Sequence, residues 1–107
     1  EGAFGPVTPD MRHFFRTHLT PAAVIEAADV FFPELQLAPS ASQARSRTFG
    51  GTLGTLTVSA RPEGGHYTFV EVQTDQMGES RLDRNVKGFF VTLHRQADPA
   101  HKLEASY

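Results

Sequence analysis

The stretch that decides the fold is TLGTLTVSA at residues 52–60, followed by RPEGG at 61–65 and HYTFVEVQT at 66–74. In the first segment, small or apolar side chains occupy every second position, whereas in the third both alternating sets contain apolar side chains. This alternation is typical of neighbouring antiparallel strands in a sheet with one solvated side. The Pro and Gly residues between the two segments predict a hairpin loop. We expect one side of the pair to be buried, and it includes Leu56, Val58, Val70 and Val72.

The sequence before this pair predicts one further strand. ARSRTF, residues 44–49, is followed by Gly50 and Gly51, which predict a two-residue hairpin turn. APSASQ, residues 38–43, is the only low-complexity stretch, and we interpret it as a loop. A meander of three antiparallel strands therefore follows a helical N-terminal part.

The clearest element is a long amphipathic helix over residues 79–96. Apolar side chains recur there at helical spacing, namely Leu82, Val86, Phe89, Phe90 and Leu93. Ser80 and Asp83, three residues apart, form a possible capping pair at its start. Its predicted outer face is basic and carries Arg81, Arg84, Lys87 and Arg95.

The N-terminal part contains one predicted helix and one ambiguous segment. From Thr20 the pattern is helical as far as Phe32, because Thr20 can cap and Pro21 suits the first helical position. The preceding segment, MRHFFRTHL at residues 11–19, fits two structures. Its apolar spacing favours a helix, whereas its aromatic content and the proline that follows Thr20 suit a strand equally well.

Length and composition indicate one folded domain over residues 1–107, with tails at 1–10 and 97–107. The chain is 39% hydrophobic and 21% charged, with a formal net charge of -2. It contains no cysteine, which excludes disulfides and thiolate chemistry. Its apolar runs are too short to cross a bilayer, and its charge offers no surplus for nucleic acid. We expect a soluble, cytoplasmic protein, although the chain opens at Glu1 and a removed signal peptide would leave no trace.

Histidines and carboxylates are the residues that would carry chemistry. The five histidines lack HExxH or His-x-His spacing, so we expect no metal and no cofactor. Around the end of the third meander strand and the start of the long helix lie Glu71, Asp75 and Glu79, with Arg81 or Arg84 in reach. Acid/base catalysis by Glu71 or Asp75 with His94 is one interpretation, and a surface ion-pair network is the favoured one.

Arginines and phenylalanines point to binding. Arg45 and Arg47 alternate along 44–49, so they would either grip an anion together or form a charged edge strand, which we favour. The chain has nine phenylalanines, more than a small sheet needs for its core. Some of them would then line an apolar pocket or a partner surface.

The order of elements resembles that of a known superfamily. The chain resembles a shortened START-like helix-grip protein, the group of polyketide cyclases and Bet v 1-type proteins. The segments that carry this resemblance are, in order, RHFFRTHLT, PAAVIEAADVFF, a meander ending in FVEVQTD, and SRLDRNVKGFFVTL. The tetrad from Pro21 to Val24 matches a Pro-x-x-Val stretch that opens the first helix of that family. The resemblance implies binding of a hydrophobic or aromatic small molecule between a sheet and a C-terminal helix, with no fixed catalytic residues.

We therefore expect an α+β domain: an antiparallel sheet of three or four strands packed against a long C-terminal helix, with one or two N-terminal helices. The leading hypothesis is a non-enzymatic domain that binds a hydrophobic small molecule, a protein partner or a second copy of itself. The residues expected to bind are Phe69, Val72, Val86, Phe89, Phe90 and Leu93. The alternatives are an accessory subunit whose Arg81, Arg84 and Lys87 face an acidic partner, and a small cofactor-free enzyme of cyclase or isomerase type.

Overall fold

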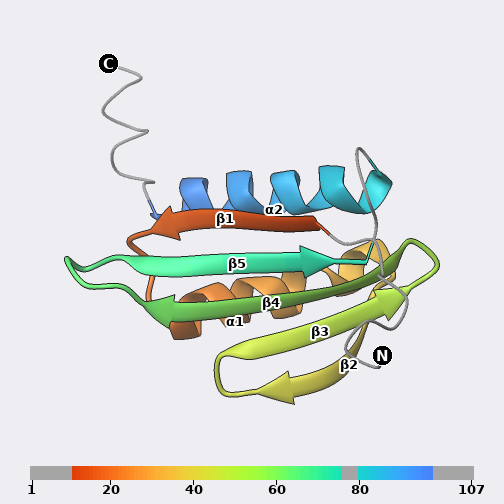
Figure 1. Ribbon diagram of the computed structural model, residues 1–107, viewed down its shortest axis with the longest axis horizontal. Coiled ribbons are helices and arrows are strands. Elements are labelled where there is room, and N and C mark those ends of the chain that lie inside the picture. Colours follow the sequence, from red (N-terminus) through yellow and green to blue (C-terminus); the bar gives the residue numbers. More distant parts are fainter. Residues whose placement is uncertain (1–10, 76–79, 98–107) are drawn as a thin grey trace, which may run out of the picture.

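The computed structural model describes residues 11–75 and 80–97, which form an α+β domain with a five-stranded antiparallel sheet (Figure 1). The elements in chain order are β1 (Met11–Thr17), α1 (Pro21–Phe31), a 3-10 helix (Pro33–Leu35), β2 (Ala38–Gln43), β3 (Ser46–Gly51), β4 (Gly54–Pro62), β5 (Thr68–Thr74) and α2 (Arg81–Ala97). The strand order in the sheet is β1-β5-β4-β3-β2. The predicted fold class is confirmed, with one or two strands more than expected.

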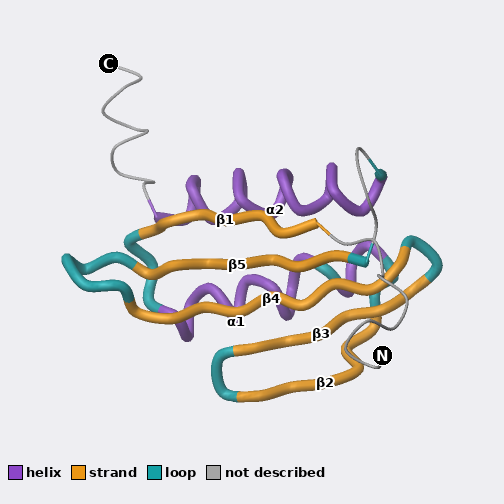
Figure 2. The backbone as a smooth tube through the Cα atoms, in the orientation of Figure 1, coloured by secondary structure: helices purple, strands orange, loops and turns teal. Residues whose placement is uncertain are grey.

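Both helices lie on the same side of the sheet, so the domain has two layers (Figure 2). Helix α1 packs against β3 and β4, and helix α2 packs against β1 and β5. None of the described helices covers the other side of the sheet. We call that side the open face.

The core lies between the sheet and the helices. Every second side chain of β4 and β5 points into it. The predicted inward residues of the two strands are buried: Leu56, Val58, Val70 and Val72. Phe32, at the end of α1, joins the layers, because its ring lies 5.3 Å from that of Phe49 on β3 and 4.9 Å from that of Phe89 on α2. All three of these phenylalanines are fully buried.

The ambiguous segment at residues 11–19 is a strand, β1, which pairs antiparallel with β5 from Met11 opposite Thr74 to Thr17 opposite Thr68. Pro21 keeps Thr20 extended, at φ -71° and ψ 159°, so the chain turns before the helix begins. Thr20 then caps α1, since its side chain accepts a hydrogen bond from the Ala23 N–H at 3.1 Å. The predicted helix start is confirmed.

Two predictions about the meander are wrong. Residues 38–43 are not a loop but the edge strand β2, whose side chains are all exposed. Because neither of its faces is covered, β2 lacks the alternation by which strands are recognised. Gly50 and Gly51 are not the turn either, because both belong to β3 and the turn consists of Thr52 and Leu53.

The tails predicted at 1–10 and 97–107 lie outside the described residues, except for Ala97 at the end of α2. In the described part of the chain, no helix is both long and apolar enough to cross a membrane.

Gly51 is required by a close backbone approach rather than by a turn. A Cβ atom at this position would lie 2.6 Å from the carbonyl oxygen of Gln36, whereas one at Gly50 would meet only the Thr55 hydroxyl at 3.6 Å. We therefore expect Gly51→Ala to lower the free energy of unfolding by about 1–3 kcal/mol, as overpacking does. The matched variant Gly50→Ala should cost clearly less. Urea unfolding of both variants measures the difference, and equal costs would contradict the prediction.

Candidate functional site

The open face carries an aromatic ring between two arginines. Strand register places Phe69 on β5 directly between Arg16 on β1 and Arg61 on β4. The guanidinium carbon of Arg61 lies 4.5 Å from the centroid of the Phe69 ring, and that of Arg16 lies 5.5 Å from it. Both distances are those of cation–π contacts. The ring is therefore held in place from both neighbouring strands.

A second aromatic ring extends this group toward the solvent. Phe14 on β1 stacks on Phe69 with 5.4 Å between ring centroids and 27° between planes. Phe14 nevertheless remains 55% exposed, although Phe is a residue type that folded proteins usually bury. Phe14, Phe69, Arg16 and Arg61 together form what we call the aromatic platform.

The charges of the platform are unevenly paired. Arg16 donates two hydrogen bonds to Glu63, at 2.6 and 3.2 Å. These bonds hold the pKa of Glu63 below its usual value. Arg61, by contrast, makes no ion pair to any of the residues that the structure describes. Arg12, at the margin, lies 3.8 Å from Glu71. Arg61 thus offers a cation on an apolar surface.

The rest of the open face is polar. Hydroxyl side chains follow one another across β4 and β3, from Ser59 to Ser46 and from Thr57 to Thr48. The Thr48 and Thr57 hydroxyls lie 3.0 Å apart and share a hydrogen bond. The aromatic platform is therefore an apolar and cationic patch with a polar surround.

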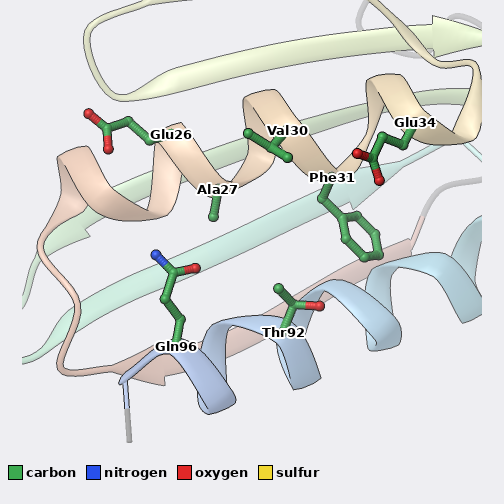
Figure 3. Close-up of a pocket in the computed structure, with 7 residues that line it drawn as sticks. All are labelled: Glu26, Ala27, Val30, Phe31, Glu34, Thr92 and Gln96. Carbon is green, nitrogen blue, oxygen red and sulfur yellow. The ribbon is translucent and has the colours of Figure 1, made fainter. Parts of the chain in front are cut away.

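Two hollows are described elsewhere on the molecule. The larger, about 490 Å³, lies between α1 and α2 on the solvent side of the helical layer (Figure 3). It is lined by Glu26, Ala27, Val30, Phe31, Glu34, Thr92 and Gln96. The smaller, about 280 Å³, lies at one end of the sheet and is lined in part by the neighbouring rings of His18 and Tyr67.

The six residues expected to bind a ligand do not gather in one site. Four of them are fully buried in the core, namely Val72, Val86, Phe89 and Leu93. Phe90 is half-buried and stacks on Phe15, with 4.9 Å between ring centroids. Phe69 lies on the open face, and neither hollow described above is lined by any of the six.

The candidate acid/base residues are also separated. Glu71 lies on the open face, whereas His94 is exposed on α2, on the other side of the sheet. Asp75 follows β5, where its carboxylate accepts a hydrogen bond from the Thr55 N–H at 3.0 Å and so ties β5 to β4. Glu79 lies outside the described residues. Arg81 and Arg84 are exposed on α2.

The edge-strand interpretation of Arg45 and Arg47 is wrong. Strand β3 is internal, because β2 pairs with its outer side. Arg47 reaches back to the helical layer and donates to Asp29 on α1 at 3.2 Å, and also to the backbone carbonyl of Gln43. Arg45 lies outside β3, in the exposed turn after β2. Arg47 is therefore paired within the fold.

Sequence reasoning missed a buried polar cluster that joins α2 to the sheet. The Ser80–Asp83 capping pair is confirmed, since the Asp83 N–H donates to the Ser80 hydroxyl at 3.1 Å and the Ser80 N–H donates to the carboxylate at 3.4 Å. The same carboxylate bonds His13 on β1 at 3.0 Å and accepts from the Thr74 hydroxyl at 3.2 Å. Three elements thus meet at Asp83, whose side chain is 2% exposed.

The chemistry of this cluster is structural. Burial by itself raises the pKa of Asp83, but hydrogen bonds from His13, Ser80 and Thr74 outweigh it and hold the pKa below its usual value. The carboxylate is therefore ionised and its acceptor capacity is used inside the fold. Within 11–75 and 80–97, no group of three His, Asp or Glu side chains is placed to hold a metal ion.

The chain matches no protein-family model and no curated protein.

Replacing Asp83 tests the role of the cluster. We expect Asp83→Asn to lower the free energy of unfolding at neutral pH by about 2–4 kcal/mol, because His13 and the helix start lose a charged acceptor. A carboxyl whose pKa is lowered by folding stabilises the fold above its unfolded value of about 3.9, and this contribution is lost in acid. The difference in free energy of unfolding between wild type and Asp83→Asn, measured with urea, should therefore become smaller below about pH 4.

The half-exposed Asp29 supplies the control. Asp29→Asn weakens a surface ion pair and should cost less than about 1 kcal/mol. If the difference in free energy of unfolding between wild type and Asp83→Asn stays constant down to about pH 2, the conclusion that the Asp83 carboxylate is ionised would be contradicted.

Proposed function

We propose that this protein is a non-enzymatic binding domain whose open face takes a protein partner, by way of an acidic residue next to an apolar side chain. The observation that carries the proposal is the aromatic platform. It combines an exposed ring, Phe14, with a guanidinium, Arg61, that forms no ion pair with any described carboxylate.

The platform has the physical features of a binding hot spot. Aromatic and arginine side chains dominate the energetics of protein interfaces, above all where they are fixed before binding. Phe69 is fixed by Phe14 and by both arginines, and Arg16 is fixed by Glu63. A partner that covers Phe14 removes its apolar area from water, at about 25 cal/mol per Å².

Charge supports an acidic partner. A carboxylate placed over Arg61 would form a charge-assisted hydrogen bond in a setting that the bound partner desolvates. The hydroxyl rows beside the platform would serve as its polar rim. A neutral or basic partner would offer Arg61 no direct ion pair.

A protein partner fits this surface better than a small hydrophobic molecule does. The helix-grip resemblance implies a ligand between the sheet and the C-terminal helix. In that space lie Val72 of the sheet and Val86 and Phe89 of the helix, all fully buried members of the core. The platform itself lies on an open sheet, which suits a broad contact rather than an enclosed ligand. The cyclase-type alternative would need His94 to meet Glu71 or Asp75, but His94 lies in the last turn of α2, Glu71 lies beside Arg12 on the open face, and Asp75 is bonded to Thr55.

The proposal is tested with a displayed library of short random peptides, selected on the immobilised wild-type domain. We expect the selected peptides to contain Asp or Glu within two positions of an aromatic or aliphatic residue. Their affinity should fall by at least about tenfold for Phe14→Ser and for Arg61→Ala, as it does when hot-spot residues are truncated.

The control is Arg84→Ala, which removes a basic side chain from the helical layer on the other side of the sheet. It should leave the affinity unchanged. Binding that persists in both platform variants, or a selection that yields no acidic preference, would overturn the proposal.

A further inference from the structure

The solvent side of the helical layer carries two matching stripes of side chains. On α1 and the turn after it, an acid, a valine and an acid stand four residues apart, at Glu26, Val30 and Glu34. On α2, a base, a valine and a base have the same spacing, at Lys87, Val91 and Arg95. All six side chains are exposed, and the valines are unusually so, at 63% for Val30 and 49% for Val91. We call these the acidic stripe and the basic stripe.

The two stripes run side by side at matching levels. The helices are antiparallel, and the hollow between them places Glu26 near Gln96 and Phe31 near Thr92 (Figure 3). Val30 is therefore level with Val91, and Glu26 is level with Arg95. Toward the other end of the groove, the Phe31 ring also lies close to Gly88. A Cβ atom on Gly88 would be 3.5 Å from that ring. Glu34 thus lies near the level of Lys87.

The charges of the layer are segregated between its helices. Helix α1 and the following turn carry Glu26, Asp29 and Glu34 and no base, whereas the exposed charges of α2 are all basic. Neither Glu26 nor Arg95 takes part in an ion pair with any described residue. A partner for this layer needs a basic stripe opposite α1, an acidic stripe opposite α2 and apolar groups between them.

A second copy of the same chain has this pattern. We infer that two copies pair through their helical layers, with a twofold axis parallel to the groove between α1 and α2. This rotation places α1 of each copy over α2 of the other. Each residue keeps its level along the groove, so residues at the same level on α1 and α2 face each other across the interface. Glu26 then faces Arg95 of the other copy, Val30 faces Val91, and Glu34 faces Lys87. Every contact occurs twice, as an isologous interface requires.

The symmetry also excludes the competing arrangement of the same two layers. A twofold axis perpendicular to the groove would place α2 over α2 and α1 over α1, so that bases face bases and acids face acids. Like charges at an interface disfavour the wrong register. The segregation of charge therefore selects one orientation of the second copy.

The size of the layer sets the expected strength. Helix α2 has 17 residues and is about 25 Å long, and α1 has 11 residues and is about 16 Å long, so the two helices side by side offer roughly 400 Å² per copy. Stable interfaces use about 800 Å² per partner. We therefore expect a weak dimer, with a dissociation constant of about 10–100 μM, that weakens further in salt.

Sedimentation velocity across protein concentration tests this pairing. For wild type we expect a concentration-dependent shift from monomer to dimer between about 10 μM and about 1 mM at low salt, and a smaller shift in about 0.5 M NaCl. Glu26→Lys and Arg95→Glu should each weaken the dimer at least tenfold, because each variant converts two attractive contacts into two repulsive ones.

Mixing the two variants is the decisive step. In a mixed pair, Lys at 26 faces Glu at 95 and the native Arg95 faces the native Glu26. An equimolar mixture of Glu26→Lys and Arg95→Glu should therefore recover dimer at concentrations where each variant alone is monomeric. Arg12→Glu, the same charge change on the open face, is the control and should leave the wild-type dimer intact.

Circular dichroism checks that every variant is folded, which is expected because both stripe residues are exposed. A wild type that stays monomeric up to about 1 mM would overturn the inference. So would a dimer that both stripe variants leave unchanged, because its interface would then lie elsewhere. Failure of the mixture to recover dimer from two weakened variants would overturn the proposed orientation.

Discussion

Phe32 is the residue on which the arrangement of the layers depends. It ends α1, packs on Phe49 of β3 and on Phe89 of α2, and is fully buried. With these contacts in place, both helices lie on one side of the sheet, and their apolar faces pack against it in the core. Among the described residues, this choice leaves the other side of the sheet and the outer side of the helices uncovered.

Much of the fold could be predicted from local patterns. Alternation in β4 and β5, the Thr20 cap and the period of α2 each reflect a short-range rule, and each is confirmed. The failures arise where a strand pairing or a backbone contact, rather than a hydrophobic period, decides the structure. Residues 38–43 form a strand because β3 pairs with them, and Gly51 is small because the Gln36 carbonyl lies against it. Neither fact leaves a periodic trace.

The candidate site was less predictable than the fold. The sequence predicts Phe69 as a binding residue on the apolar surface between the sheet and the C-terminal helix, but its neighbours lie on the opposite side of the sheet. Arg16 and Phe69 are brought together by the pairing of β1 with β5, and the sequence left open whether residues 11–19 form a strand at all. His13 and Asp83 meet across 70 residues for the same reason. Side-chain groups assembled by register become visible only when register is known.

The two proposed surfaces constrain each other. The aromatic platform lies on the open face and the charged stripes lie on the outer side of the helical layer, so a pair of chains joined through the helical layers would display both open faces outward. Such a pair would carry two equivalent platforms at a fixed separation. A partner with two acidic and apolar segments would then gain affinity from bivalent contact without any new interaction. Because the joining contacts are electrostatic, that gain would fall with salt more steeply than the affinity of one platform for one segment.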